Sequence, residues 1–301
     1  MSRKLCVNLA GVELKNPVVT ASGTFGSGKD HSIFFDLGLI GGVTVKGVSH
    51  EPWPGNPPPR IAETYGGMLN AVGLQNNGAK AFIENDLPFL RGFDTKVIVN
   101  LCGRTVEDYV KVVRDFENVD IDILELNISC PNIKMGGIAM GTCPKTAEEV
   151  TRAAKKYAKV PLFVKLSPNV TDIISIAKAV EAGGADGISL INTLLGMKID
   201  IANRTPLLGN TFGGLSGRAI KPIALRMVYQ VAKNVNLPII GMGGVATGED
   251  AIEFIMAGAT AVAVGTANFT NPYAMVEIVK GIESFVEEHN VSDINEIRGV
   301  A

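Results

Sequence analysis

A cysteine follows a buried strand in the segment Leu124–Gly137, which reads LELNISCPNIKMGG. Residues 123–128 have the apolar and polar alternation of a strand, and Pro131 ends it because proline has no N–H to donate to a sheet. We therefore expect Asn127 and Cys130 at the end of a strand, in front of a loop rich in Gly and Asn. The simpler interpretation is that Cys130 is a small buried core residue.

Two lysines interrupt strands that are otherwise apolar: Lys46 in GVTVKGV and Lys165 in PLFVKL. An ammonium group in such a strand must be paired or poorly solvated, which is rare without a function. Lys165 is compatible with two chemistries. It could stabilise the anion of a reduced flavin, or it could form a Schiff base as in an aldolase.

The elements that must position these residues are short apolar strands, most of them followed by an amphipathic stretch. Strands are predicted at residues 17–22, 42–48, 96–101, 123–128, 161–166, 187–191, 238–242 and 261–264. Helices are predicted at 31–39, 106–116, 146–159 (with Thr146 and Glu149 as a capping box), 172–182, 219–235, 249–256 and 272–287.

Strands that are apolar throughout and separated by helices indicate a parallel sheet covered on both faces. Eight such units in roughly 250–300 residues favour an α/β fold with a single (β/α)₈ TIM barrel over residues 1–301. An open doubly wound sheet is the alternative. The two long insertions, residues 49–93 and 194–217, are predicted to be loops at the carboxyl-terminal face of the barrel.

The carboxyl ends of the strands form the active face of such a barrel. The residues predicted there are Ser22, Gly23, Lys46, Gly47, Asn100, Asn127, Cys130, Lys165, Ser167, Asn192, Thr193, Gly243, Gly244, Gly265 and Thr266. Glycines after the last two strands suit a phosphate, because backbone N–H groups can approach the anion closely. Ordinary glycine turns are the alternative, and the asparagines could be turn formers. The set as a whole suits flavin mononucleotide or a sugar phosphate.

Composition excludes several other classes of function. The chain has 301 residues, 46% of them hydrophobic, and a net charge of −2, which indicates neither nucleic acid nor an anionic membrane as a partner. No apolar run approaches a membrane span of about 20 residues, and no targeting segment is predicted. The four cysteines have no metal-ligand spacing, so we expect no metal, no structural disulfides and a cytoplasmic location.

Motifs spread from about Asn16 to Pro272 resemble the class 1 dihydroorotate dehydrogenases. They include ELNISCPN (125–132), GGMLNAVGLQN (66–76), FVKLSPN (163–169), IIGMGGV (239–245) and AVAVGTANF (261–269). The loop IKMGGIAMG (133–141) is similar to that of the class 1B catalytic subunit and unlike the fumarate-linked class 1A loop. Class 2 enzymes use a serine base and carry an N-terminal membrane extension, so Cys130 and the lack of a predicted extension disfavour class 2.

The resemblance implies an FMN enzyme of pyrimidine (UMP) biosynthesis that oxidises (S)-dihydroorotate to orotate. Cys130 would remove the C5 proton while the C6 hydride passes to FMN. The implied FMN ligands are Ser22, Lys46, Gly47, Asn100, Asn127, Lys165, Ile191, Gly217, Gly243, Gly244, Gly265 and Thr266. The implied substrate ligands are Lys46, Asn70, Ala71, Val72, Gly73, Leu74, Asn127, Asn192 and Thr193.

The resemblance also implies a partner subunit that carries FAD and a [2Fe–2S] cluster and passes electrons to NAD⁺. The expected assembly is a heterotetramer of two catalytic and two electron-transfer subunits around a homodimer core. Four alternatives stay open: a fumarate-linked enzyme without a partner, a dihydropyrimidine dehydrogenase, a Schiff-base lyase using Lys165, and a non-catalytic phosphate-binding barrel.

Overall fold

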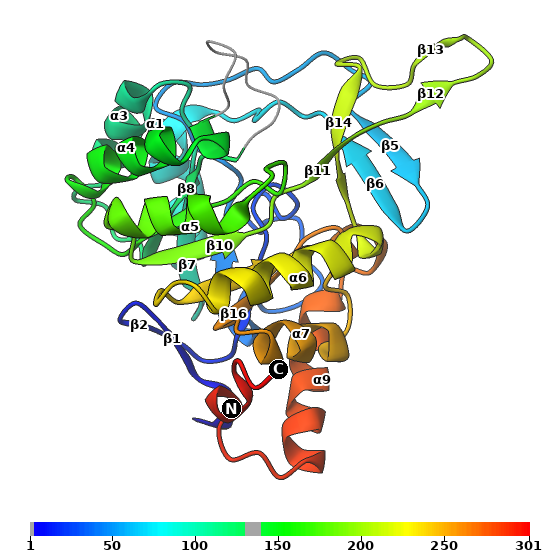
Figure 1. Ribbon diagram of the computed structural model, residues 1–301. Coiled ribbons are helices and arrows are strands. Elements are labelled where there is room, and N and C mark those ends of the chain that lie inside the picture. Colours follow the sequence, from blue (N-terminus) through cyan, green and yellow to red (C-terminus); the bar gives the residue numbers. More distant parts are fainter. Residues whose placement is uncertain (1–2, 130–139) are drawn as a thin grey trace.

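The chain folds into a closed barrel of eight parallel strands in a computed structural model that describes residues 3–129 and 140–301 (Figure 1). The strands are β3 (Val18–Thr20), β4 (Gly42–Thr44), β7 (Lys96–Leu101), β8 (Ile123–Asn127), β9 (Leu162–Lys165), β10 (Gly187–Leu190), β15 (Ile239–Met242) and β16 (Ala261–Val264). They pair in the order β10-β15-β16-β3-β4-β7-β8-β9. The predicted TIM barrel is confirmed, and the open sheet is excluded because β9 and β10 pair to close the ring.

Helices cover the outside of the barrel. They are α3 (Val106–Asp115), α4 (Pro144–Lys155), α5 (Ile173–Ala182), α6 (Lys221–Ala232), α7 (Gly248–Met256) and α9 (Ala274–Glu288). Capping explains where several of them begin. Thr105 and Thr247 each form a capping box with the aspartate three residues later, and the side chain of Asp172 accepts the N–H of Ile174. No helix in the described ranges is long and apolar enough to cross a membrane.

Two predicted helices differ from the structure. The predicted capping box of Thr146 and Glu149 is wrong, because α4 already begins at Pro144, a residue that suits the first helical position. Residues 31–39 form turns and only a short 3₁₀ helix, η2 (Leu37–Leu39), instead of a helix. There the Asp36 side chain accepts the N–H of Gly38 and holds the chain in a local turn.

The prediction that the two insertions are loops is wrong. They pair with each other in a four-stranded antiparallel sheet. Its order is β11 (Leu194–Met197), β14 (Phe212–Ser216), β6 (Gly67–Asn70) and β5 (Ile61–Thr64). The pairing of Leu215 with Leu69 joins the two insertions, and Ala62, Leu69, Ala71 and Leu208 form a small core of their own. Figure 1 shows this sheet beyond the end of the barrel, with the hairpin of β12 (Ile199–Asp200) and β13 (Thr205–Pro206) farthest out.

The remaining elements are short. An antiparallel hairpin of β1 (Val7–Leu9) and β2 (Val12–Leu14) begins the described chain after η1 (Arg3–Leu5). The first insertion also contains α1 (Gly78–Ala81), the π-helical turn η3 (Phe82–Asp86) and α2 (Leu87–Leu90). The short helices η4 (Met140–Thr142), η5 (Arg218–Ile220), α8 (Ala267–Thr270) and η6 (Ile294–Ile297) complete the fold.

Candidate functional site

A cavity of about 830 Å³ opens at the carboxyl ends of the barrel strands, under the four-stranded sheet. Its volume lies in the range of roughly 300–1,000 Å³ that is usual for cofactor and substrate sites. The predicted site residues that line it are Ser22, Lys46, Gly47, Asn70, Val72, Gly73, Leu74, Asn100, Asn127, Lys165, Ile191, Asn192, Thr193, Gly217, Gly243, Gly244, Gly265 and Thr266. Parallel strands end at one face, so residues far apart in the sequence meet here.

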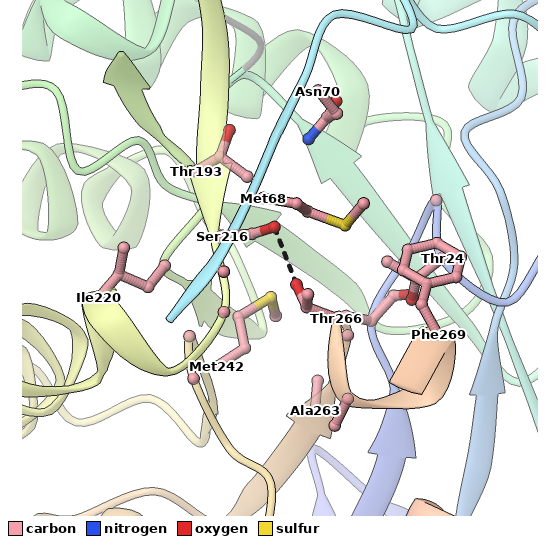
Figure 2. Close-up of a pocket in the computed structure, with 18 of the residues that line it drawn as sticks. Thr24, Met68, Asn70, Thr193, Ser216, Ile220, Met242, Ala263, Thr266 and Phe269 are labelled. Atoms are coloured by element: carbon pink, nitrogen blue, oxygen red, sulfur yellow. Dashed lines mark hydrogen bonds between the residues drawn. The ribbon is translucent and has the colours of Figure 1, made fainter. Parts of the chain in front are cut away.

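The four-stranded sheet provides one wall of this cavity. Figure 2 shows Met68, Asn70 and Ser216 facing the barrel residues Met242, Ala263 and Thr266. The Thr266 hydroxyl donates to Ser216 Oγ at 2.8 Å, and this bond ties the loop after β16 to β14 (Figure 2). Asn70 Nδ2 donates to the carbonyl of Gly214 at 3.3 Å. The sheet that the sequence analysis missed therefore helps to shape the site.

Lys165 and Glu125 form a buried ion pair on the floor of the site. Lys165 Nζ lies 4.0 Å from Glu125 Oε1, and their side chains are only 5% and 1% exposed. Lys165 also donates to Ser22 Oγ at 3.0 Å, while Glu125 accepts the Nδ2 amide of Asn100 at 2.6 Å. Because buried charges are costly unless paired, this geometry keeps an ammonium group next to the cavity.

Three further polar side chains continue this buried network. Asn127 Nδ2 donates to Asn100 Oδ1 at 3.4 Å, and Asn127 Oδ1 accepts the hydroxyl of Ser129 at 2.7 Å. Ser129 Oγ in turn accepts Nδ2 of Asn192 at 2.7 Å. The amides that were predicted one by one from strand ends are thus connected to each other.

The loops after β15 and β16 are the predicted phosphate site, and we call their glycine turns the glycine cradle. Gly243 and Gly244 have φ values of +124° and +83°, and a Cβ on either would lie 2.7 Å from Ala224 Cβ or Lys221 Cβ. Only glycine fits these two positions, and the backbone approaches the cavity closely there. Gly265 and Thr266 lead into the short helix α8, which resembles the extra helix of barrel phosphate sites.

Two predicted site residues that the structure describes, Ser167 and Ala71, do not line this cavity. Ser167 is buried, and its hydroxyl oxygen accepts the N–H of Asn169 at 3.2 Å. Ala71 is 1% exposed and packs in the small core of the four-stranded sheet, because its side chain points to the sheet interior. Cys130 lies outside the described residues. Lys46 does line the cavity, although it follows β4 by two residues and so lies beyond the strand in which the sequence placed it.

Glu125 and Ser129 also belong to the buried network, although neither was predicted as a site residue. The expected alternation in residues 123–128 would place a polar side chain such as Glu125 on a solvated face, yet all five residues of β8 are buried. The signal that singled out Lys46 and Lys165, a charged residue inside an apolar strand, applies to Glu125 as well. It would have identified this carboxylate as a partner for Lys165.

Asp250 supports the loop that holds Gly243 and Gly244. Its carboxylate accepts the backbone N–H groups of Ala246 and Thr247, and it pairs with Lys221. Burial raises the pKa of Asp250, but the hydrogen bonds and charge of Lys221 and the two N–H groups outweigh it, so the pKa lies below its ordinary value. A lowered pKa means that the carboxylate stabilises the folded state fully above pH 3.8, the ordinary value of an aspartate, and that this contribution is lost as the pH falls through the lower pKa of the folded state.

We therefore expect Asp250→Asn to lower the free energy of unfolding by about 1–3 kcal/mol near pH 7. The difference from the wild type should shrink as the pH falls below 3.8, where the wild type also loses this charge. Urea unfolding near pH 7 and near pH 3 measures both. Asp200→Asn is the control, because Asp200 accepts similar local bonds from Asn203 but is exposed on the β12–β13 hairpin. Equal stability of Asp250→Asn and the wild type near pH 7 would contradict this role.

The fold and the site together define a (β/α)₈ barrel whose active face has a buried cation, an amide network and a glycine cradle. Comparison with known proteins narrows this class. The family model described as Dihydroorotate dehydrogenase matches residues 4–286, so the chain belongs to the dihydroorotate dehydrogenase family.

Individual relatives agree with this family. The chain is 66% identical over 293 residues to the "Dihydroorotate dehydrogenase B (NAD(+)), catalytic subunit" of Alkaliphilus metalliredigens, which covers 97% of both chains. It is 65% identical to the protein of the same name from Alkaliphilus oremlandii, over 99% of this chain and 98% of that one. It is 53% identical to that of Desulforamulus reducens, over 100% and 99%. The resemblance to the class 1B catalytic subunit is confirmed.

Proposed function

We propose that this chain oxidises (S)-dihydroorotate to orotate in pyrimidine biosynthesis, as the catalytic subunit of an NAD⁺-linked enzyme. The observation that carries the proposal is the buried pair of Lys165 and Glu125 beside the amides of Asn100 and Asn127, in the same cavity as the glycine cradle. A site with one buried cation and one anion cradle suits a ligand with a redox-active ring and a phosphate. Family membership over most of the chain supports this assignment.

FMN fits the cavity by size and by chemistry. The glycine loops at Gly243–Gly244 and Gly265–Thr266 would hold the phosphate, together with Gly217, whose φ of +105° likewise favours glycine. Lys165 would lie against the flavin edge, with its charge balanced by Glu125 and its position fixed by Ser22. The other proposed FMN ligands are Lys46, Gly47, Asn100, Asn127 and Ile191. When bound, FMN supplies the acceptor for the hydride of the substrate.

The substrate would lie between the barrel and the four-stranded sheet. Asn127, Asn192 and Thr193 come from strand ends of the barrel, and Asn70 comes from β6. The segment 72–74 and Lys46 line the same cavity. Amides suit the urea-like edge of a reduced pyrimidine because each offers both donors and an acceptor. Lys46 would balance the charge of the carboxylate. Ala71 would contribute through its main chain alone, because its side chain lies in the sheet core.

Cys130 is the proposed base for the C5 proton. It follows Ser129 directly, and Ser129 is bonded to both Asn127 and Asn192. This position in the chain supports the assignment, which otherwise depends on the family resemblance. A thiolate at Cys130 would hold the proton that leaves C5 while the ring loses its hydride.

The names of the relatives, each a "catalytic subunit" of an NAD(+) enzyme, support a separate partner subunit for this chain. We propose that the partner carries FAD and a [2Fe–2S] cluster and that two copies of each subunit assemble around a homodimer of catalytic subunits. Exposed apolar side chains on the four-stranded sheet and its hairpin support an assembly role for that face. They include Leu195, Met197, Ile199, Ile201 and Phe212.

The visible spectrum of the purified protein tests the proposal. We expect a yellow protein that bleaches under anaerobic conditions when dihydroorotate is added, because hydride transfer removes the absorbance of oxidised flavin. Dihydrouracil is the matched control, since it lacks only the carboxylate. Bleaching by dihydrouracil but not by dihydroorotate would point to a dihydropyrimidine dehydrogenase. A colourless protein that does not bind added FMN would overturn the proposal in favour of a Schiff-base lyase.

The electron acceptor is tested on the same protein. With the partner subunit present, we expect NAD⁺ to be reduced by dihydroorotate. Efficient reduction of fumarate by the isolated chain would point to the fumarate-linked alternative instead.

A further inference from the structure

Glu125 is a buried carboxylate to which the proposed reaction gives no direct role. It lies in the middle of β8 and is 1% exposed. Its Oε1 accepts Nδ2 of Asn100 at 2.6 Å and lies 4.0 Å from Lys165 Nζ. An ionised carboxylate accepts hydrogen bonds but donates none, so Asn100 must turn its NH₂ group towards it.

The hydrogen bonds beyond Asn100 all run in one direction. Asn192 donates to Ser129 at 2.7 Å, Ser129 donates to Asn127 at 2.7 Å, and Asn127 donates to Asn100 at 3.4 Å. Asn100 then donates to Glu125. We call this series of five residues the amide chain. Every donor in it points towards Glu125, which is its one charged acceptor.

This direction determines what the amide chain presents to a ligand. An asparagine amide that turns by 180° exchanges its oxygen and nitrogen with little change of shape, so hydrogen bonds and not packing orient it. The backbone contributes to the observed direction, because Asn127 Oδ1 accepts the N–H of Ser129 at 3.3 Å and Asn192 Oδ1 accepts the N–H of Thr193 at 2.8 Å. Asn100 has no such backbone partner among the described residues, and its direction is set by Glu125. In the observed direction, Asn127 and Asn192 each use one N–H within the amide chain. Both side chains line the cavity, and the second N–H of each has no acceptor among the residues that the structure describes.

We propose that Glu125 is a positioning residue: it orients Asn100, and Asn100 in turn gives Asn127 its acceptor, so that Asn127 and Asn192 offer N–H donors to oxygen acceptors of the ligand. This inference rests on the proposed function, in which the ligand is dihydroorotate or orotate, both rich in carbonyl and carboxylate oxygens. Lys165 balances the charge of Glu125 and so allows a carboxylate to remain in the floor of the site.

Glu125→Gln tests the proposal because it keeps the size of the side chain but adds a donor. The Asn100 amide can then turn round and bring its NH₂ group against Nδ2 of Asn127, which loses its acceptor and is displaced from the observed position. For the FMN-loaded protein, titrated with orotate and followed by the change in flavin absorbance, we expect Kd to rise about tenfold or more. We also expect the midpoint potential of the bound flavin to rise, because a nearby negative charge is lost.

Asp122→Asn is the matched control. Asp122 is the residue before β8, and its paired carboxylate lies 2.9 Å from Arg91 Nη1 and 3.3 Å from Lys96 Nζ. Asp122→Asn removes a paired carboxylate at the amino end of β8, away from the cavity. The variant therefore measures how much a loss of folding stability alone changes orotate affinity. We expect orotate affinity and flavin potential to stay at the wild-type values. Orotate affinity of Glu125→Gln within twofold of Asp122→Asn would overturn the proposal.

Ser129→Ala tests the same inference by a second route, which also serves if Glu125→Gln fails to fold. It cuts the amide chain between Asn127 and Asn192 and leaves Glu125, Asn100 and Lys165 in place. We expect weaker orotate binding with an unchanged flavin potential. Unchanged orotate affinity would overturn the proposal. The wild type tests the proposed function separately. If it neither holds FMN nor binds orotate, the proposed function is wrong, whereas a wild type that binds both and variants that bind orotate equally well would contradict only the role of Glu125.

Discussion

Replacing Lys165 with methionine is expected to cost the apoprotein about 3–5 kcal/mol of its free energy of unfolding, because the buried carboxylate of Glu125 then has no cation beside it. Both side chains are at least 95% buried, so water cannot compensate for the lost charge. The same variant should also bind FMN more weakly and reduce it more slowly, since the ammonium group at the cavity is removed. Urea unfolding of the apoprotein and titration with FMN measure the two effects separately.

Two further variants make this test specific. Lys155→Met is the matched control, because Lys155 pairs with Asp186 at 2.5 Å in a site where the two side chains are 35% and 28% exposed. A partly exposed pair of that kind contributes about 1 kcal/mol or less. The double variant Lys165→Met, Glu125→Gln should recover stability but not FMN affinity. A Lys165→Met apoprotein as stable as the wild type would show that Glu125 does not depend on this lysine.

Replacing Cys130 with serine is expected to lower turnover by about 10²–10⁴-fold, the usual contribution of a positioned general base. A serine hydroxyl keeps nearly the same size but accepts a proton from carbon far less readily than a thiolate. FMN should remain bound, because the proposed flavin ligands are unchanged. Steady-state oxidation of dihydroorotate with a dye as acceptor, normalised to flavin content, measures the loss.

Cys143→Ser is the control for this second experiment. Hydrogen bonds from Thr146 and the N–H of Lys145 lower the pKa of the Cys143 thiol below its ordinary value, which makes it a demanding control. Cys143 is not among the residues that line the cavity, and we expect its replacement to leave turnover unchanged. Normal turnover of Cys130→Ser would remove Cys130 from the mechanism. If both variants lost turnover to a similar extent, the loss could not be assigned to Cys130 as the base.

The barrel and many of the residues that line its cavity could be predicted from local patterns in the sequence. Apolar strands that alternate with amphipathic stretches can bury both faces only in a parallel sheet, and a parallel sheet brings every carboxyl end to the same side. Lys165, Asn127 and Asn192 were therefore predictable members of one site, although they come from three different strands. The apolar and amphipathic patterns that support this prediction involve residues close together in the chain, so a single sequence is enough to show them.

The tertiary structure alone decided the second sheet and the partners within the site. β6 and β14 pair Asn70 with Gly214 across more than 140 residues. Both strands have only four or five residues and contain glycine, so neither shows a clear apolar period. This pairing directs Ala71 into a small core and places Asn70 over the cavity. In the same way, the sequence pattern shows Glu125 only as one polar residue of an alternating strand. Its position beside Asn100 and Lys165 depends on the closed barrel. Which buried groups pair is decided by contacts between distant segments, and those contacts exist only once the barrel has closed.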